Sequence, residues 1–458
     1  MIKNNSYHIV SLGCAKNDVD SDSMAQLLQS DGYQPQNELK DAQIIIVNTC
    51  GFIEPAREES IKTLKSIAAR KRKGQYLIAA GCLTQRYAEQ VAREVKGLDG
   101  IMGTRNWMDI VQVVHQIRNG NAPQTPYHLP TDQTSPADPP QVMRTSIQGA
   151  SAYIKIADGC RRPCAFCAIP LIKGKPVSRP ISAIVADARK LVEQGVKEII
   201  LIAQDTTDYG TDLGLKEGLS QLLDALVKNV PEIPWIRILY AYPGYVTDRL
   251  IEQIASYKQI LPYLDMPLQH AHPDTLKRMQ RPANMDWVYR TIEKMRRQIP
   301  NLALRTTFIV GYPGETEQEF QTLLDFVKEM RFDRMGAFQF SFERGTASES
   351  LGDPIPPQVK QERLERLLSL QQSVSLQINQ TWVGKTLSVL IEAKTEMQDE
   401  YGNPTNQFVS IGRSYRESPE IDGLVIIKGK APLGEIKKVK IDGALPYDLF
   451  GTLLKSNS

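Results

Sequence analysis

The sequence predicts an α/β protein in three parts: a parallel sheet, a partial (βα)6 barrel and a small all-β barrel. Two series of short apolar runs separated by helical segments predict the first two parts, and closely spaced strands after Gly384 predict the third. A length of 458 residues is enough for about three domains.

The first 118 residues alternate strand-like and helix-like segments. Apolar runs at Tyr7–Leu12, Ile44–Val47 and Tyr76–Ala80 are separated by longer mixed segments such as Asp20–Ser30. This βαβ pattern predicts a parallel sheet over residues 1–118. Residues 119–145 carry six prolines among Thr, Ser, Asp and Gln. We expect an extended linker there, because such a composition does not build a core.

A second strand–helix series occupies residues 146–382 and predicts a barrel, closed or open. An apolar stripe at helical spacing, from Leu364 to Ile378, ends this part. Over residues 383–454 short strands are broken by Gly, Pro and Asp, which predicts a small β-barrel. The strand-like runs of the central part are Ala152–Ala157, Glu198–Ala203, Trp235–Tyr240, Tyr263–Met266, Ala303–Val310 and Met335–Phe340.

The composition is that of an ordinary folded protein, with 41% apolar and 23% charged residues and a net charge of +3. No run approaches the ~18 apolar residues of a membrane span. The N-terminal residues show no secretory leader. We therefore expect a cytoplasmic protein whose thiols stay reduced, so its six cysteines are expected to bind metal or to take part in catalysis.

The strongest chemical signal is the segment Cys160–Cys167, which holds three cysteines directly after the first predicted strand of the central part. Gly159 and Pro163 favour a loop in which the three sulfurs turn toward one point. A structural zinc site normally has four protein ligands, and the sequence offers no fourth nearby. Three thiolates suit a four-iron–four-sulfur cluster with one open iron. A zinc site or buried structural thiols are the alternatives.

Three further cysteines, Cys14, Cys50 and Cys82, each end a strand-like run of the first part. The ends of successive parallel strands lie along one edge of a sheet, where α/β proteins bind ligands. We therefore predict that these cysteines converge and hold a second cluster. A single cysteine at the end of a strand is more often a core residue, so the prediction of a cluster requires that all three cysteines lie at corresponding strand ends.

The central segment resembles the radical-SAM superfamily, which carries this cysteine spacing on the loop after its first barrel strand. The resemblance implies that Cys160, Cys164 and Cys167 hold a 4Fe–4S cluster whose open iron binds S-adenosylmethionine. It also nominates cofactor contacts beside the last cysteine and at later strand ends, where barrels place active residues. For the turn Gly311–Glu315 a purely structural role is the alternative. The candidates are Phe166, Ala168, Gln204, Asp205, Tyr240, Arg305, Thr307 and Gly311.

Two cysteine sets, a flavodoxin-like first domain, a radical-SAM core and a small TRAM barrel together resemble the methylthiotransferase family over nearly the whole chain. One branch of that family acts on a tRNA adenosine, and another on an aspartate of ribosomal protein S-twelve. From Gly384 onward ten Lys and Arg balance ten Asp and Glu, whereas a nucleic-acid clamp is usually basic. The segments that resemble the ribosomal-protein branch are Ser11–Asn17, Tyr263–Ala271, Leu304–Gly311, Gly412–Arg416 and Pro419–Gly423.

The resemblance implies a reaction in which a radical made from S-adenosylmethionine removes hydrogen from the aspartate β-carbon. A methylated sulfur species on the cluster of Cys14, Cys50 and Cys82 then joins that carbon. It further implies that both clusters face one cavity, and that a flavodoxin- or ferredoxin-type donor supplies the electron. The alternatives are the same chemistry on tRNA, with Arg70–Lys73 as an RNA patch, and a zinc-holding RNA-binding module. For His270 and His272, substrate contact and a structural role both stay open.

Overall fold

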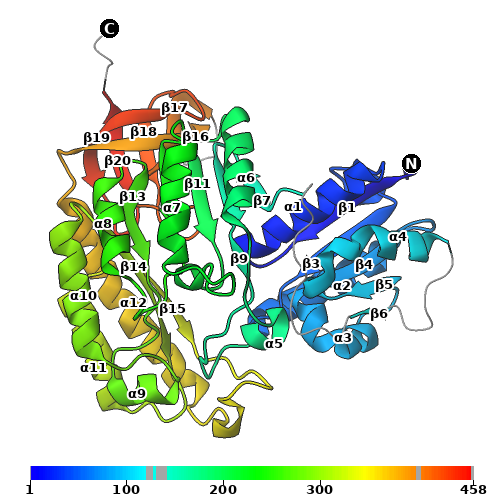
Figure 1. Cartoon of the computed structure of the whole chain (residues 1–458), viewed down its shortest axis with the longest axis horizontal. Helices are drawn as coiled ribbons and strands as arrows, with labels where there is room; N and C mark the ends of the chain where they lie inside the picture. The colour runs from blue at the N-terminus through cyan, green and yellow to red at the C-terminus, as the bar shows by residue number, and fades with distance from the viewer. Residues whose placement is uncertain (1, 120–126, 130–141, 399–403, 455–458) are drawn as a thin grey trace.

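The computed structural model describes residues 2–119, 127–129, 142–398 and 404–454, which form three parts in chain order (Figure 1). The first is a six-stranded sheet, the second a seven-stranded sheet curved into an open barrel, and the third a closed five-stranded barrel. This is the predicted fold class. Of the helices in the described part of the chain, none is both long and apolar enough to cross a membrane.

All strands of the first sheet are parallel, in the order β2-β1-β3-β4-β5-β6. The central strand β3 is buried along its whole length, because its apolar residues pack against helices on both faces. The strands are β1 (Ser6–Ser11), β2 (Gln34–Pro35), β3 (Ile44–Thr49), β4 (Tyr76–Gly81), β5 (Gly100–Met102) and β6 (Tyr127–His128). The helices are α1 (Ala15–Ser30), α2 (Glu54–Arg70), α3 (Cys82–Glu94) and α4 (Ile110–Arg118).

Three strands of this sheet were not predicted, because β2, β5 and β6 have only two or three residues and show no periodicity. Strand β6 lies inside the proline-rich segment that we expected to be an extended linker, and it pairs with β5 through Ile101 and Tyr127. Residues 120–126 and 130–141 of that segment lie outside the described residues.

The central barrel has six parallel strands, and an antiparallel strand β7 (Thr145–Gln148) lies beside the first of them. Strands β15 and β7 are the two edges, so the barrel is open. Apolar side chains fill the space between the strands and the surrounding helices. The parallel strands are β8 (Ser151–Lys155), β11 (Glu198–Ile202), β12 (Trp235–Ile238), β13 (Ile260–Asp265), β14 (Ala303–Val310) and β15 (Arg334–Gln339).

The surrounding helices alternate with the strands along the chain, as the sequence predicts. They are α6 (Ile181–Glu193), α7 (Gly218–Asn229), α8 (Asp248–Ser256), α9 (Pro273–Arg278), α10 (Met285–Gln298), α11 (Glu317–Met330) and α12 (Pro357–Gln380). The short elements β9 (Ala157–Asp158), α5 (Ile169–Lys173) and β10 (Val177–Ser178) follow β8 and lie between the barrel and the first sheet (Figure 1).

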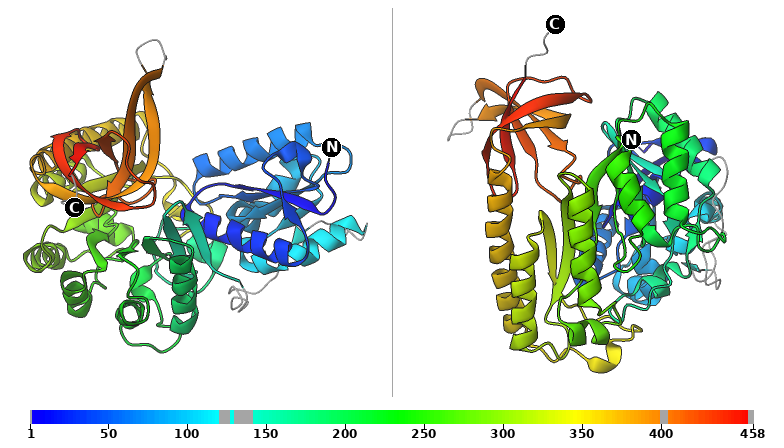
Figure 2. Two further views of the ribbon diagram at one scale, coloured as in Figure 1. Left: turned by 90° about the horizontal axis from the view of Figure 1, so that it is seen from above. Right: turned by 60° about the vertical axis from the view of Figure 1, so that its left-hand side comes forward.

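The long helix α12 leads to the C-terminal barrel (Figure 2). Its strands close in the order β16-β17-β18-β20-β19. Two buried ion pairs of one carboxylate join it to the central barrel, because Glu198 of β11 lies 2.7 Å from Arg237 and 2.6 Å from Arg413. The strands are β16 (Thr386–Gln398), β17 (Pro404–Ser414), β18 (Val425–Lys428), β19 (Ile436–Ala444) and β20 (Leu449–Leu453).

Candidate active site at two sets of cysteines

The first cysteine set lies on the loop between β9 and α5. Gly159 turns the chain with φ +81°, and a Cβ at this position would lie 2.2 Å from the carbonyl oxygen of Lys175. The Cys160 N–H donates to the carbonyl of Gly174 at 3.1 Å, and the Cys167 N–H to that of Cys164. These backbone contacts close the loop on itself. The short spacing of the three cysteines therefore keeps their side chains close to one another.

Hydrogen-bond donors surround these sulfurs. The Arg162 N–H lies 3.4 Å from Cys160 Sγ, and Arg281 Nη1 lies 3.5 Å from Cys164 Sγ. Burial raises the pKa of Cys160 to about 11 and that of Cys167 to about 12. Without a metal these thiols are therefore protonated, and a bound metal would take the place of their protons.

The second set lies at the carboxyl ends of β1, β3 and β4, which pair in register with Ser11 opposite Asn48 and Thr49 opposite Gly81. Each cysteine follows the end of its strand, so the set forms along one edge of the sheet. The structure therefore brings together Cys14, Cys50 and Cys82, which are far apart in the sequence.

Two glycines and one amide hold this set. A Cβ on Gly13 would lie 2.7 Å from Cys50 Cβ, and one on Gly81 would lie 2.4 Å from the carbonyl oxygen of Thr49. The Asn17 amide donates to the carbonyls of Leu12 and Thr49 at 2.8 and 3.2 Å, and its oxygen lies 3.6 Å from Cys82 Sγ. The close approach of the strand ends therefore requires glycine at both positions.

The three thiols of the second set differ in exposure. Cys50 and Cys82 are buried and Cys14 is exposed. Burial raises the pKa of Cys82 to about 12, with Cys50 and Cys14 adding to the shift and Lys173 opposing it. The exposed side of this set is therefore the side of Cys14.

The two sets meet through α5. Cys82 packs with Ala168 and Ile172 in a small buried cluster, and Ala168 is the residue directly after Cys167. Next to them, Asp20 of α1 lies 2.6 Å from Arg144, 2.5 Å from Lys155 and 2.9 Å from Lys173. Burial alone would raise the pKa of Asp20, but the three cations hold it far below its ordinary value.

The same cations reach Asp158, which lies 3.1 Å from Lys155 and 3.3 Å from Lys173. We call Asp20, Arg144, Lys155, Asp158 and Lys173 the buried ion group. It joins α1 to the barrel at the segment that carries the first cysteine set.

A second attachment lies on the other side of the first domain. Arg86 of α3 forms a buried ion pair with Glu343 at 2.8 Å and donates to the carbonyl of Arg344. The Glu54 N–H donates to Ser341 Oγ at 3.3 Å. The first domain is therefore fixed to the barrel both near α5 and at the loop after β15.

Two of the predicted cofactor contacts belong to the surroundings of the first set. Gln204 donates to Asp158 at 3.1 Å, and its side-chain oxygen is buried without a hydrogen-bond partner among the described residues. Asp205 pairs with Arg162 at 2.6 Å and accepts from the N–H of Thr207. Asp205 thus orients the residue whose N–H contacts Cys160.

Arg305 and Thr307 lie together on the inner face of the barrel. Arg305 pairs with Asp265 at 2.9 Å and with Asp422 of the C-terminal barrel at 3.4 Å, and it lies 3.3 Å from Thr307 Oγ1. Tyr240 follows β12 in the left-handed conformation, with φ +61°.

The remaining candidates lie in packed surroundings. Gly311 has φ +72°, and a Cβ there would lie 2.4 Å from Lys360 Cγ, so the turn is packed beneath α12. Phe166 packs against Met279, Tyr312 and Phe340. His270 is fully buried and accepts from the His272 N–H at 3.0 Å, and its Nε2 lies 3.6 Å from Glu315 Oε2.

Sequence reasoning assigned no role to three features of the site. Lys16 lies with its Nζ 3.4 Å from the centre of the Tyr240 ring. Phe338 of β15 is 53% exposed, and a Cβ on nearby Gly336 would lie 3.3 Å from Arg305 Nη2. The buried ion group was the third. A lysine inside the apolar run Ala152–Ala157 was its available signal, because a fully buried charge requires a partner.

The donor sets fit iron–sulfur clusters better than single metal ions. A single zinc ion with Zn–S bonds of about 2.3 Å draws its sulfurs to within about 3.8 Å of one another. Throughout the described ranges, the only three ligand atoms within 4.8 Å of one another belong to His272, Asp274 and Glu319. Each cysteine set is therefore wider than zinc requires, offers three thiols, and suits a cluster with one open iron.

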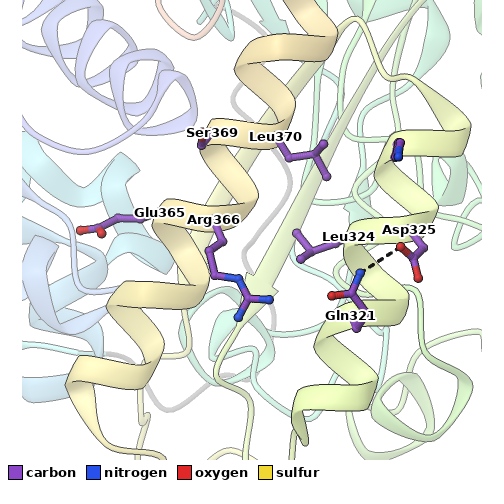
Figure 3. A pocket seen from close by; sticks show the side chains of 8 residues that line it. Gln321, Leu324, Asp325, Glu365, Arg366, Ser369 and Leu370 are labelled. Carbon is purple, nitrogen blue, oxygen red and sulfur yellow. Dashed lines mark hydrogen bonds between the residues drawn. The ribbon is translucent and has the colours of Figure 1, made fainter.

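A groove of about 570 Å³ lies on the outer side of the barrel, between α11 and α12 (Figure 3). Its side chains are mostly polar and charged, and Gln321 donates to Asp325 at 2.9 Å. None of the cysteines lines it, so it is separate from the candidate site.

An open six-stranded parallel barrel with three cysteines on the loop after its first strand defines the class of radical-SAM enzymes. Family models match residues 154–327 as Radical SAM superfamily, residues 6–103 as Uncharacterized protein family UPF0004 and residues 383–454 as TRAM domain. The chain belongs to the radical-SAM methylthiotransferase family, in the branch of the ribosomal protein uS12 methylthiotransferases. It is 47% identical to "Ribosomal protein uS12 methylthiotransferase RimO" of Chloroflexus aurantiacus, covering 98% of this chain and 99% of that protein.

Other relatives agree. The RimO protein of Synechocystis is 44% identical, covering 96% of each chain. Among solved structures, the radical S-adenosylmethionine methyltransferase TsrM from Kitasatospora setae superposes with a TM-score of 0.56 at 12% identity, covering 88% of this chain and 87% of that one. This likeness concerns the fold alone.

Proposed function

We propose that this protein methylthiolates the β-carbon of an aspartate in ribosomal protein uS12. The supporting observation is the pair of cysteine sets joined through Cys82 and Ala168, in a chain that matches the uS12 methylthiotransferases along nearly its whole length. In this proposal Cys160, Cys164 and Cys167 hold the cluster that binds S-adenosylmethionine, and Cys14, Cys50 and Cys82 hold the auxiliary cluster that carries sulfur.

The clusters and S-adenosylmethionine, when bound, supply the one-electron chemistry that activates an unreactive carbon. The protein supplies position. Arg162 and Arg281 donate toward the sulfurs of the first set and so stabilise negative charge there. The two attachments of the first domain hold the second set against the barrel.

The finer assignments are part of the same proposal. Phe166, Ala168, Gln204, Asp205, Tyr240, Arg305, Thr307 and Gly311 are the proposed contacts of S-adenosylmethionine. Among them, Gln204 is supported by its unpartnered buried oxygen and Arg305 by its place on the inner face. The proposal also includes a low-potential electron donor of the flavodoxin or ferredoxin type and a cytoplasmic location.

Mass spectrometry of uS12 after anaerobic turnover tests the function. The native protein is expected to add one methylthio group to an aspartate, and Cys160→Ala is expected to add none. Addition to tRNA instead of uS12 would contradict the substrate assignment. Release of 5′-deoxyadenosine with no sulfur addition to either would leave only a general radical-SAM enzyme.

A further inference from the structure

Lys16 occupies an unusual place for a lysine. It lies in the first turn of α1, two residues after Cys14, and is half-buried. Its Nζ lies 3.4 Å from the centre of the Tyr240 ring. Within the part of the chain that the structure describes, no carboxylate lies within 4.0 Å of this ammonium group.

The other cations near the two cysteine sets are already neutralised or bound within the protein. Lys155 and Lys173 pair with Asp20 and Asp158, and Arg305 pairs with Asp265. Arg162 pairs with Asp205. Arg281 donates to Cys164 Sγ and to the carbonyl of Pro267. Lys16 therefore differs from these cations, because its ammonium group lies over an aromatic ring and forms no ion pair within 4.0 Å among the described residues. It can therefore bind the carboxylate of a ligand.

Tyr240 adopts a strained backbone conformation. Its left-handed backbone is unfavourable for a residue other than glycine. Contacts on both sides fix it: the Tyr240 N–H lies 3.3 Å from Asp265 Oδ2, and its carbonyl accepts from the Thr206 N–H at 3.1 Å. This conformation places the ring beneath Lys16. Asp265, the carboxylate whose charge also favours the ammonium group, is itself paired with Arg305 at 2.9 Å.

The place of Lys16 matches the chemistry of the proposed substrate. An aspartate side chain carries its carboxylate on the very carbon that is to receive sulfur, and Cys14 is the exposed member of the auxiliary set. A cation two residues from Cys14 can therefore reach the carboxylate when that carbon approaches the sulfur. An adenine base carries no such anion.

We propose that Lys16 binds the carboxylate of the target aspartate, with Tyr240 positioning its ammonium group, and thereby selects an acidic side chain as substrate. This inference rests on the proposed function, which it deepens. Lys16 is a substrate-binding residue in this account, and Tyr240 is a positioning residue.

The test measures binding of two synthetic peptides to the full-length, cluster-reconstituted protein under anaerobic conditions. One peptide spans the target aspartate of uS12, and the other has asparagine in its place. Fluorescence anisotropy gives both affinities for the native protein and for Lys16→Met, Lys16→Gln and Lys16→Arg. Lys62→Met, on the exposed face of α2, is the matched control. Iron content and thermal unfolding of every variant verify that it is folded and loaded.

The native protein and Lys62→Met are expected to prefer the aspartate peptide by about 10- to 100-fold, the usual effect of one charge-assisted hydrogen bond. Lys16→Met and Lys16→Gln are expected to bind both peptides equally, and Lys16→Arg to keep most of the preference. Formation of 5′-deoxyadenosine without peptide should stay unchanged in the control Lys62→Met.

Three results would overturn the inference: no preference in the native protein, a preference retained in Lys16→Met, or weaker S-adenosylmethionine binding by Lys16→Met without peptide. The last would assign Lys16 to the cofactor. Failure of the proposed function looks different, because the native protein would then leave the uS12 peptide unmodified. A native protein that modifies the peptide and a Lys16→Met variant that modifies it equally well would reject only the role of Lys16.

Discussion

The two cysteine sets differ in how the chain assembles them. The first lies on one loop, closed by backbone hydrogen bonds of Cys160 and Cys167, so its geometry is local. The second comes from the ends of β1, β3 and β4 and exists only when the sheet is formed. The first set is therefore specified by the spacing of its cysteines in the sequence, and the second set by the fold of the sheet. Damage to the first domain should therefore affect the two sets unequally.

The largest expected effect separates the two sets by chemistry. Cys160→Ala should abolish 5′-deoxyadenosine formation and the methylthio product together, because it removes a proposed ligand of the cluster that would bind S-adenosylmethionine. Cys14→Ala should abolish the product but still form 5′-deoxyadenosine. Each variant should fall from about eight to about four bound irons. Iron analysis and chromatography of the products check this, and a Cys14→Ala protein with full iron would remove the auxiliary cluster from the account.

The next effect concerns the junction between the sets. Asp20→Asn leaves Arg144, Lys155 and Lys173 facing Asp158 alone, so it should cost about 4 kcal/mol of unfolding free energy. Denaturant unfolding measures this loss, and hydrogen exchange should rise in α1 and α5. Asp22→Asn, at an exposed position of the same helix, is the control. Equal stability of the two variants would mean that the buried ion group does not hold the junction.

A glycine substitution in the first domain tests whether the second cysteine set depends on the close approach of the strand ends. In Gly81→Ala a Cβ would lie 2.4 Å from the carbonyl oxygen of Thr49, with φ +105°. We expect a loss of about 3 kcal/mol and of the auxiliary iron, while the iron on the first set remains. In Gly32→Ala the backbone is also left-handed, with φ +90°, but nothing lies within 4 Å. It should cost only about 1 kcal/mol and keep all iron, and iron loss in both variants would contradict the strand-end explanation.

The smallest effect concerns the ion pairs that join the C-terminal barrel, which has no cysteines, to the central barrel. Burial opposes ionisation of Glu198, but Arg237 and Arg413 lower its pKa from 4.5 to about 2. A carboxylate whose pKa is lowered in the folded state stabilises the fold at pH values above its ordinary pKa. This stabilisation is lost as the pH falls toward the lowered pKa. About 2 kcal/mol should therefore be lost by pH 3. Denaturant unfolding at pH 7 and at pH 3 measures this loss of unfolding free energy. The Glu198→Gln variant should lack the part of the loss that comes from Glu198. A native protein equally stable at both values would refute it.

The sequence predicted the long elements well, and it failed where elements are short. The six parallel barrel strands lie where apolar runs predicted them, because burial on both faces produces continuous apolar segments. The closely spaced strands near the C-terminus form the small β-barrel that was predicted for them. Strand β6 could not be found, since Tyr127 and His128 stand among prolines and become a strand only by pairing with β5.

The site shows the same division. All six cysteines could be nominated from spacing and from strand ends, yet the pairing of Asp20 with three cations could not. Asp20 and Lys173 are 153 residues apart in sequence, and only the tertiary fold brings their side chains together. Lys16 was visible beside Cys14, but its place over the Tyr240 ring becomes evident only in three dimensions.

The two-sided attachment of the first domain has a consequence for the geometry of turnover. Opening either side would expose ions that are now buried, at Asp20 or at the Arg86–Glu343 pair. A movement of the first domain away from the barrel, on either side, therefore carries the cost of leaving a buried charge without its partner.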